Sequence, residues 1–218
     1  MKALTQQRIR IKYGKFGALR FVGHLDTAKT WERILRRARL PLEYTQGFNP
    51  RPRMQFAAAL AVGLTSESEY LDAWLTGRLD GSPSEEWISR LAATSPAGIK
   101  IYSLDEVPIS GAALPTLVTH AEYVITPADA ELALSDLQSR AAMLLAQAAL
   151  ERMNNKDKPY DLRPLILDLR VEAEGLVASL KTGEKGNARP DDLLQAMGID
   201  VGQVHVHRRR LFLSETAS

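Results

Sequence analysis

Residues 26–38, DTAKTWERILRRA, decide the first half of the fold, because they form the clearest amphipathic helix in the sequence. Apolar side chains recur at the i, i+3, i+7 spacing that places them on one helix face: Ala28, Trp31, Leu35 and Ala38. Aspartate accepts the first free N–H groups of a helix, so we expect Asp26 to be the N-cap. The stretch therefore predicts a helix with one buried and one charged face.

Strands are predicted on both sides of this helix. Before it, Arg8–Tyr13 alternates basic and apolar residues, as a strand with one face in water does. After it, we expect strands at 42–47, 56–62, 71–75 and 99–104, with a helix that runs through Leu91. The second half predicts strands at 122–125, 165–171, 176–180 and 203–212, and helices that end near Ala146 and Met197.

Both halves therefore follow the order β-α-β-loop-β-β-α-β. This order predicts an α+β fold of two tandem ferredoxin-like halves, of the β-α-β-β-α-β type, with helices packed on one side of each sheet. Residues 105–115 contain two prolines and several small residues, which are typical of a linker. We expect a basic N-terminal half at 1–107 and a C-terminal half at 116–218.

Composition excludes several classes of protein. The 218 residues include no cysteine, which excludes disulfides, thiolate zinc sites, cysteine nucleophiles and cysteine-held iron–sulfur clusters. No apolar run approaches the roughly 18–20 residues that a membrane span needs. The N-terminus also lacks the apolar run of a signal peptide. We therefore expect a cytoplasmic protein with no membrane partner and no cofactor of its own.

Charge is distributed unevenly along the chain. Residues 8–55 contain 12 Lys/Arg and 3 Asp/Glu, a net charge of +9. Residues 56–150 contain 4 and 12, a net charge of −8, and residues 151–218 contain 11 of each. A local excess of positive charge attracts anions even when the whole chain is close to neutral.

A basic stripe, defined as Lys29, Arg33, Arg36 and Arg37, follows i, i+4, i+7, i+8 spacing on the predicted helix. Prolines at 50 and 52 stiffen the loop that follows, and guanidinium groups bind phosphates or carboxylates through two hydrogen bonds. The alternative is a solvated helix face beside a structural turn. The candidate anion-binding residues are Arg20, His24, Lys29, Arg33, Arg36, Arg37, Gln46, Asn49, Arg51 and Arg53.

His24 allows more than one interpretation. With Asp26 it is a possible acid–base pair or part of a metal site. Alternatively, Asp26 caps the helix and His24 bonds the backbone. His205 and His207 lie on one face of a predicted strand, where they are more typical of an exposed face than of a metal site. The sequence has no Walker loop, dinucleotide-binding fingerprint or nucleophile elbow.

Several stretches together resemble a bacterial radical-SAM-linked family of unknown function, found alone or joined to the C-terminus of a radical SAM protein with a cobalamin-binding region. The matching stretches are RFVGHLD at 20–26, ERILRRA at 32–38, YTQGFNPRPR at 44–53, SESEYLDAWL at 66–75 and YDLRP at 160–164. A radical SAM enzyme holds its cluster with cysteines. The resemblance therefore implies a radical SAM protein as a separate partner chain, with this chain as its substrate-binding or scaffold component.

Three functional hypotheses follow. Genes of the family often lie near those for ribonuclease G and ribosomal proteins, which makes RNA or the ribosome a candidate substrate of a non-catalytic binding subunit. In this hypothesis His24, Gln46 and Asn49 supply specificity. Tandem ferredoxin-like halves with a basic face also resemble the metal-independent endoribonucleases that process CRISPR repeats, in which case His24 is the general acid or base. The third hypothesis is a protein–protein adaptor whose basic half docks an acidic surface.

Overall fold

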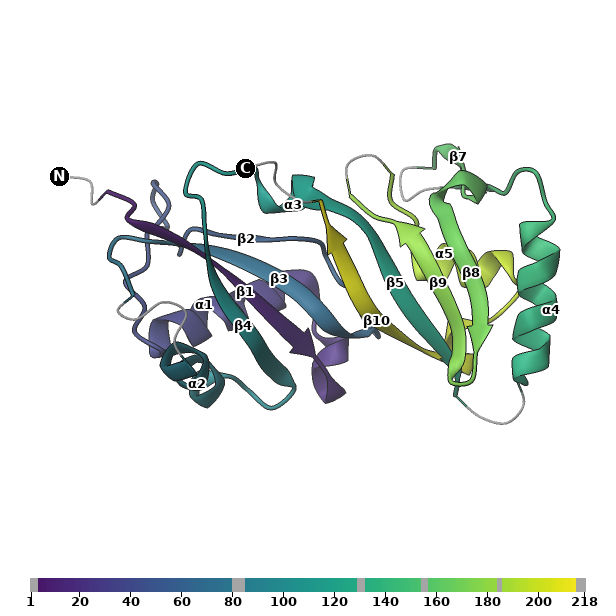
Figure 1. Ribbon diagram of the computed structural model, residues 1–218, viewed down its shortest axis with the longest axis horizontal. Coiled ribbons are helices and arrows are strands. Elements are labelled where there is room, and N and C mark those ends of the chain that lie inside the picture. The colour runs from purple at the N-terminus through teal and green to yellow at the C-terminus, as the bar shows by residue number, and fades with distance from the viewer. Residues whose placement is uncertain (1–3, 80–84, 129–131, 154–156, 184–185, 215–218) are drawn as a thin grey trace. The chain divides into compact units, whose positions relative to one another are not determined.

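The computed structural model describes residues 4–79, 85–128, 132–153, 157–183 and 186–214. The protein is a mixed α+β fold with antiparallel sheets and few helices, shown in Figure 1. The chain divides into two compact units between Leu117 and Val118, which we call unit 1 and unit 2. Unit 1 contains the whole basic segment of the sequence.

Unit 1 is built on four antiparallel strands in the order β4-β1-β3-β2. Its first strand therefore lies between its third and its last. The elements are β1 (Gln7–Lys15), η1 (Gly17–Phe21), α1 (His24–Arg37), β2 (Met54–Phe56), β3 (Thr65–Leu75), α2 (Glu85–Thr94), β4 (Ile99–Val107) and α3 (Leu114–Leu117).

One face of this sheet is covered by α1 and α2. Alternate residues of β1 and β3 point to this face, and they form a single buried cluster with the apolar sides of both helices. Trp31 of α1 is completely buried, and its ring meets that of Tyr13 edge to face at 4.6 Å. Burying each large apolar side chain contributes roughly 1.5–3 kcal/mol, so this cluster holds α1 against the sheet.

The other face of the sheet buries a charged residue of β1. Arg8 is only 1% exposed, and it donates hydrogen bonds to the Asp72 carboxylate at 2.6 and 3.0 Å. The expectation that the basic face of β1 lies in water is wrong at this position. Arg8 also donates to the carbonyl oxygens of Pro108, Gly111 and Ala112. The middle of the segment expected to be a linker thus lies against Arg8 within unit 1.

Three local predictions for unit 1 differ from the structure. Residues 42–47 form only the isolated bridges Leu42–Leu75 and Tyr44–Pro52, and the strand expected at 56–62 ends at Phe56. Helix α1 begins at His24, because Gly23 has extended backbone angles and its carbonyl accepts the Thr27 N–H at 2.9 Å. Asp26 therefore lies inside the first turn, and its prediction as N-cap is wrong.

Unit 2 has four antiparallel strands in the order β10-β5-β9-β8, again with its first strand between the last and the third of the four. Helix α4 packs against β8 and β9 (Figure 1). The elements are β5 (Val118–Pro127), α4 (Leu134–Leu145), the β6 (Glu151–Met153) and β7 (Pro159–Asp161) hairpin, η2 (Arg163–Leu165), β8 (Ile166–Glu172), β9 (Gly175–Lys181), α5 (Pro190–Ala196), η3 (Val201–Gln203) and β10 (Val204–Leu213).

Within the described ranges, every helix is too short or too polar to cross a membrane.

Candidate anion-binding site

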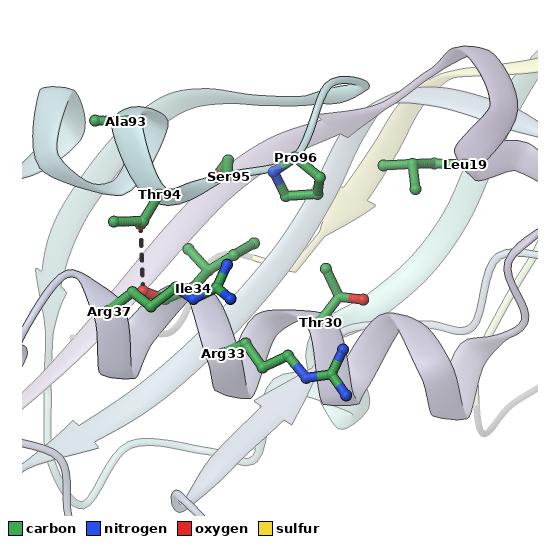
Figure 2. Close-up of a pocket in the computed structure, with 9 residues that line it drawn as sticks. All are labelled: Leu19, Thr30, Arg33, Ile34, Arg37, Ala93, Thr94, Ser95 and Pro96. Carbon is green, nitrogen blue, oxygen red and sulfur yellow. Dashed lines mark hydrogen bonds between the residues drawn. The ribbon is translucent and has the colours of Figure 1, made fainter.

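A pocket of about 510 Å³ lies beside α1 in unit 1. One side is formed by α1, the other by the end of α2 and the residues that follow it, and Leu19 of η1 closes one end (Figure 2). The lining residues are Leu19, Thr30, Arg33, Ile34, Arg37, Ala93, Thr94, Ser95 and Pro96. The pocket therefore joins part of the basic stripe to a segment about sixty residues further along the chain.

The wall opposite α1 is fixed by hydroxyl groups. Thr94 donates to the Ile34 carbonyl oxygen at 3.3 Å, the interaction drawn as a dashed line in Figure 2, and so links the two helices. Ser95 donates to the Leu91 carbonyl oxygen at 2.8 Å. Pro96 follows directly, and proline disfavours helix in the residue before it. Because both hydroxyls bond the backbone, the groups left for a ligand are mainly those of α1.

Arg33 and Arg37 supply the free charge of the pocket. They lie four residues apart on α1, so they are neighbours on successive turns, as Figure 2 shows. In the part of the chain that the structure describes, neither guanidinium has an ion-pair or hydrogen-bond partner, and the residues that line the pocket include no carboxylate. Two unpaired cations on one wall give the pocket a positive potential, which attracts anions.

The other cations of the candidate set have partners. Lys29 contacts Asp26 at 3.0 Å. Arg36 and Arg51 share the Glu32 carboxylate, at 3.2 and 3.9 Å. These ion pairs lie outside the pocket lining. The cations predicted from the sequence therefore fall into two groups, one unpaired in the pocket and one paired outside it.

Arg53 and Arg20 rest on aromatic rings. Arg53 contacts Glu43 at 3.2 Å, and its guanidinium carbon lies 4.5 Å from the centre of the Trp74 ring. Arg20 lies 4.7 Å above the ring of Phe21, and its neighbour Leu19 lines the pocket. Charge–π contacts stabilise the arginine without neutralising it, so Arg20 still adds positive potential near the pocket.

Gln46 and Asn49 lie apart from the pocket, in a loop that we call the Phe48 loop and define as residues 45–51. Both side chains are exposed. The loop is closed at its base by the Thr45 N–H donating to the Arg51 carbonyl at 2.8 Å. Five of the ten predicted residues therefore lie on α1, and Arg51 contacts that helix through Glu32. Arg53 instead contacts Glu43 and Trp74, so the set is not brought into one pocket.

His24 does not form the predicted pair with Asp26. It is the first residue of α1, it is exposed, and its ring meets that of Phe56 edge to face at 5.2 Å. Two residues along a helix correspond to a rotation of about 200°, so the side chains of His24 and Asp26 point apart. No group of three or more His, Asp or Glu able to hold a metal occurs among the residues described.

Sequence reasoning missed two parts of this region. The far wall at Thr94–Pro96 comes from the end of a second helix, and no local pattern links it to α1. Phe48, at the tip of its loop, has a relative exposure of 105%. The sequence could have indicated this exposure, because Phe48 lies between Gly47 and Asn49 in a turn-forming stretch, and the tip of a turn has few neighbours to cover a ring.

The fold and its basic helix define a mixed α+β protein with a positively charged helix surface. A family model described as an uncharacterized protein conserved in bacteria (DUF2344) matches residues 8–190. The chain belongs to this family, and the matched residues include most of both units.

Comparison with curated proteins finds no match. Among solved structures, the chain is similar to one in the crystal structure of a Cbf5–Nop10–Gar1 complex, with a TM-score of 0.49 and 12% sequence identity. The alignment covers 95% of this chain and 50% of that one, so this chain spans about half of its length.

Proposed function

We propose that unit 1 binds a phosphate-bearing polyanion, RNA, and that the chain is a non-catalytic component that presents it to a separate radical SAM enzyme. The observation that carries the binding proposal is the pair of free guanidinium groups, Arg33 and Arg37, on one wall of the pocket. Like charges on successive helix turns repel each other, which costs stability unless an anion lies between them.

The chemistry of the pocket fits phosphate. A guanidinium offers a planar set of donors that bonds two phosphate oxygens at once. The Cβ atoms of residues four apart on a helix are about 5–6 Å from each other, so two such groups can hold one phosphate or two successive ones. The positive net charge of residues 8–55 adds a longer-range attraction that steers a polyanion toward this unit.

The proposal extends to the fold. Each unit has the succession β-α-β-β-α-β, with antiparallel strands in the order fourth, first, third, second. We propose that both are ferredoxin-like units, and that unit 2 carries the β6–β7 hairpin as an insertion. A fold of this kind serves many functions, so the RNA proposal rests on the site and not on the topology.

Binding of single-stranded RNA over a series of salt concentrations tests the proposal. Each neutralised phosphate contributes about −0.7 to the slope of log affinity against log salt. The Arg33→Ala/Arg37→Ala variant should bind more weakly and flatten this slope by about 1 to 1.5 units. The matched control is Arg78→Ala/Arg210→Ala, which removes the same charge from two exposed arginines outside the pocket lining.

An equal loss in both double variants would mean that only net charge matters, and unchanged RNA binding in the pocket variant would refute the site. The endoribonuclease hypothesis is tested in the same samples. If the purified chain cleaves RNA and His24→Ala abolishes cleavage, a catalytic role replaces the binding role.

A second function, docking of a partner protein, is favoured by an exposed apolar cluster. Phe21, Leu25 and Val62 have relative exposures of 63%, 76% and 59%. The Gly63 N–H donates to the Arg20 carbonyl oxygen at 2.8 Å, which brings the segments of Phe21 and Val62 together. We propose this cluster as the contact with the radical SAM partner. Phe21→Ser/Leu25→Ser should abolish co-purification of that partner while RNA binding persists, and unchanged co-purification would contradict the assignment.

A further inference from the structure

The most exposed aromatic side chain among the described residues is that of Phe48, with a relative exposure of 105%. It follows Gly47, whose φ of +131° allows the tight turn at the tip of the loop. A fully exposed phenylalanine ring is unusual, because it leaves its whole apolar surface in water. An aromatic ring kept in this state can bury its area against a ligand.

The Phe48 loop is closed at its base. The Thr45 N–H bonds the Arg51 carbonyl at 2.8 Å, and the Arg51 N–H bonds the Thr45 hydroxyl at 3.1 Å. Tyr44 and Pro52 form a further bridge just outside this pair. These contacts restrict the loop before any ligand arrives, so binding at its tip orders fewer residues and loses less entropy.

Groups around the ring suit a nucleobase. Gln46 precedes Phe48 in sequence and Asn49 follows it, and both side chains are exposed. Each amide offers both a hydrogen-bond donor and an acceptor. Arg51, at the base of the loop, shares the single carboxylate of Glu32 with Arg36, which leaves an excess positive charge there. Aromatic rings that stack on unpaired bases, amides that bond base edges, and arginines for phosphate together typify sites for single-stranded RNA.

The loop and the pocket can contact the same strand, because both border α1. Glu32 contacts Arg51 of the loop, and Arg36 contacts Glu32. These two residues form one row along the helix, and Arg33 and Arg37 form the next row, about 100° further round. We propose that the Phe48 loop takes one unstacked base of a single-stranded RNA, with Phe48 stacked on the base and Gln46 and Asn49 bonded to its edges. This inference rests on the proposed function, in which the pocket holds the phosphates.

The test compares Phe48→Ala with Phe48→Trp for binding of an oligouridine strand and of inorganic polyphosphate, which has no bases. Loss of one stacked base typically weakens binding by about 5- to 150-fold. Phe48→Ala should lower RNA affinity within that range and leave the salt slope unchanged, because no charge is removed. Phe48→Trp should retain RNA affinity, and polyphosphate should bind equally to both variants. Ile109→Ala, which trims another exposed apolar side chain in unit 1, is the matched control.

The outcomes separate this inference from the proposed function. If Phe48→Ala binds RNA like the parent while Arg33→Ala/Arg37→Ala flattens the slope, the stacking role is wrong and the phosphate site stands. If Phe48→Ala weakens RNA and polyphosphate alike, the loop acts through the fold and the inference is overturned. If RNA does not bind the parent chain even at low salt, the proposed function itself fails. Loss of a co-purifying protein without loss of RNA affinity would assign Phe48 to protein docking and overturn the inference.

Discussion

The arginines of α1 in unit 1 and those on the sheet of unit 2 show two uses of one side chain. In unit 2, Arg170 contacts the carboxylates of Asp168, Glu122 and Glu172. Arg209 contacts Glu172 and Glu174 as well as Glu122. In unit 1, Arg33 and Arg37 have no such partner among the residues described. These paired arginines bind acids of their own strand and of other strands of the sheet, whereas unpaired arginines are available to a ligand.

The charge distribution along the chain explains much of this difference. Residues 151–218 contain equal numbers of acids and bases, so a cation there has an acid to meet. Residues 8–55 contain 3 acids, and two of them, Glu32 and Glu43, are already shared with Arg36, Arg51 and Arg53. The third, Asp26, contacts Lys29. Arg33 and Arg37 therefore remain on α1 without an acid of this segment, and this contrast predicts which arginines support the fold and which support binding.

The largest effect on stability is expected at Arg8, the buried member of the paired class. Arg8→Met removes hydrogen bonds to Asp72 and to three carbonyl oxygens. Removing one partner of a buried ion pair typically costs about 3–5 kcal/mol. Thermal unfolding should therefore show a Tm lower by roughly 10 °C. Arg10 is the second partner of Asp72, at 2.8 Å. In the control, Arg10→Ala leaves the Arg8 contacts in place and should cost less, and an equal loss in both variants would contradict the special role of Arg8.

A cluster in unit 2 should give the next largest effect. Tyr160 donates to Asp192 at 2.8 Å, and Arg189 contacts the same carboxylate at 3.0 Å. Burial, followed by the bond to Asp192, raises the pKa of Tyr160 to about 12, so its hydroxyl stays protonated as a donor. Tyr160→Phe removes a hydrogen bond to a charged acceptor and should lower the free energy of unfolding by about 1–2 kcal/mol in urea titrations.

The difference in the free energy of unfolding between Tyr160→Phe and the parent should depend on pH. Burial opposes ionisation of Asp192, but hydrogen bonds from Arg189 and Tyr160 outweigh it and hold its pKa below the ordinary value of 3.8. A carboxyl group whose pKa is lower in the folded than in the unfolded state stabilises the fold at pH values above its unfolded-state pKa. This stabilisation is lost as the pH falls through the folded-state pKa. The difference between Tyr160→Phe and the parent should therefore be constant near neutral pH and shrink below about pH 4. A difference that grows in acid would contradict this assignment.

Part of the local structure could be predicted from the sequence, since helical spacing identified the buried side of α1 at Trp31 and Leu35. Of the other two predicted positions, Ala28 is half-buried and Ala38 is buried just after the helix ends. The environment of Arg8 could not be predicted, because Asp72 and the carbonyl groups that accept its hydrogen bonds are distant in sequence. Alternation of basic and apolar residues indicates two faces of a strand, but it does not say what covers the polar face.

The position of the basic stripe on α1 was predictable from the sequence, but the division of its cations into paired and unpaired ones was not. The spacing of the basic stripe placed all four cations on α1, as the structure has them. It could not show that Glu32 pairs with both Arg36 and Arg51, because the second contact depends on the path of the Phe48 loop. That long-range contact leaves Arg33 and Arg37 as the free members.

A smaller effect on stability is expected where a paired arginine of α1 is removed. Arg36→Ala deletes an i, i+4 pair with Glu32, and exposed pairs of this kind contribute about 0.2–1 kcal/mol. Arg51 remains near the same carboxylate, so the loss should fall near 0.5 kcal/mol in urea titrations. Its effect on the salt slope of RNA binding should be smaller than that of Arg33→Ala. A larger effect would show that the Arg36–Glu32 pair opens when RNA binds.

The smallest effect is expected at Arg33, and it should have the opposite sign. Arg33 is exposed, faces Arg37 at i, i+4, and has no acid partner among the described residues. Like charges at this spacing destabilise a helix by about 0.2–0.5 kcal/mol, and alanine has the highest helix propensity. Arg33→Ala should therefore raise the free energy of unfolding by a few tenths of a kcal/mol in low salt. The gain should vanish in high salt, which screens the repulsion.

The same substitution should weaken RNA binding, so stability and affinity move in opposite directions at this one residue. Arg33→Gln keeps the length and polarity of the side chain and separates the loss of charge from the loss of packing. If Arg33→Ala instead destabilises the free protein in both salts, Arg33 makes a structural contact and belongs to the paired class. A stabilised variant with weakened RNA binding would show that the free arginines of α1 are kept for the ligand, at a cost to the unliganded fold.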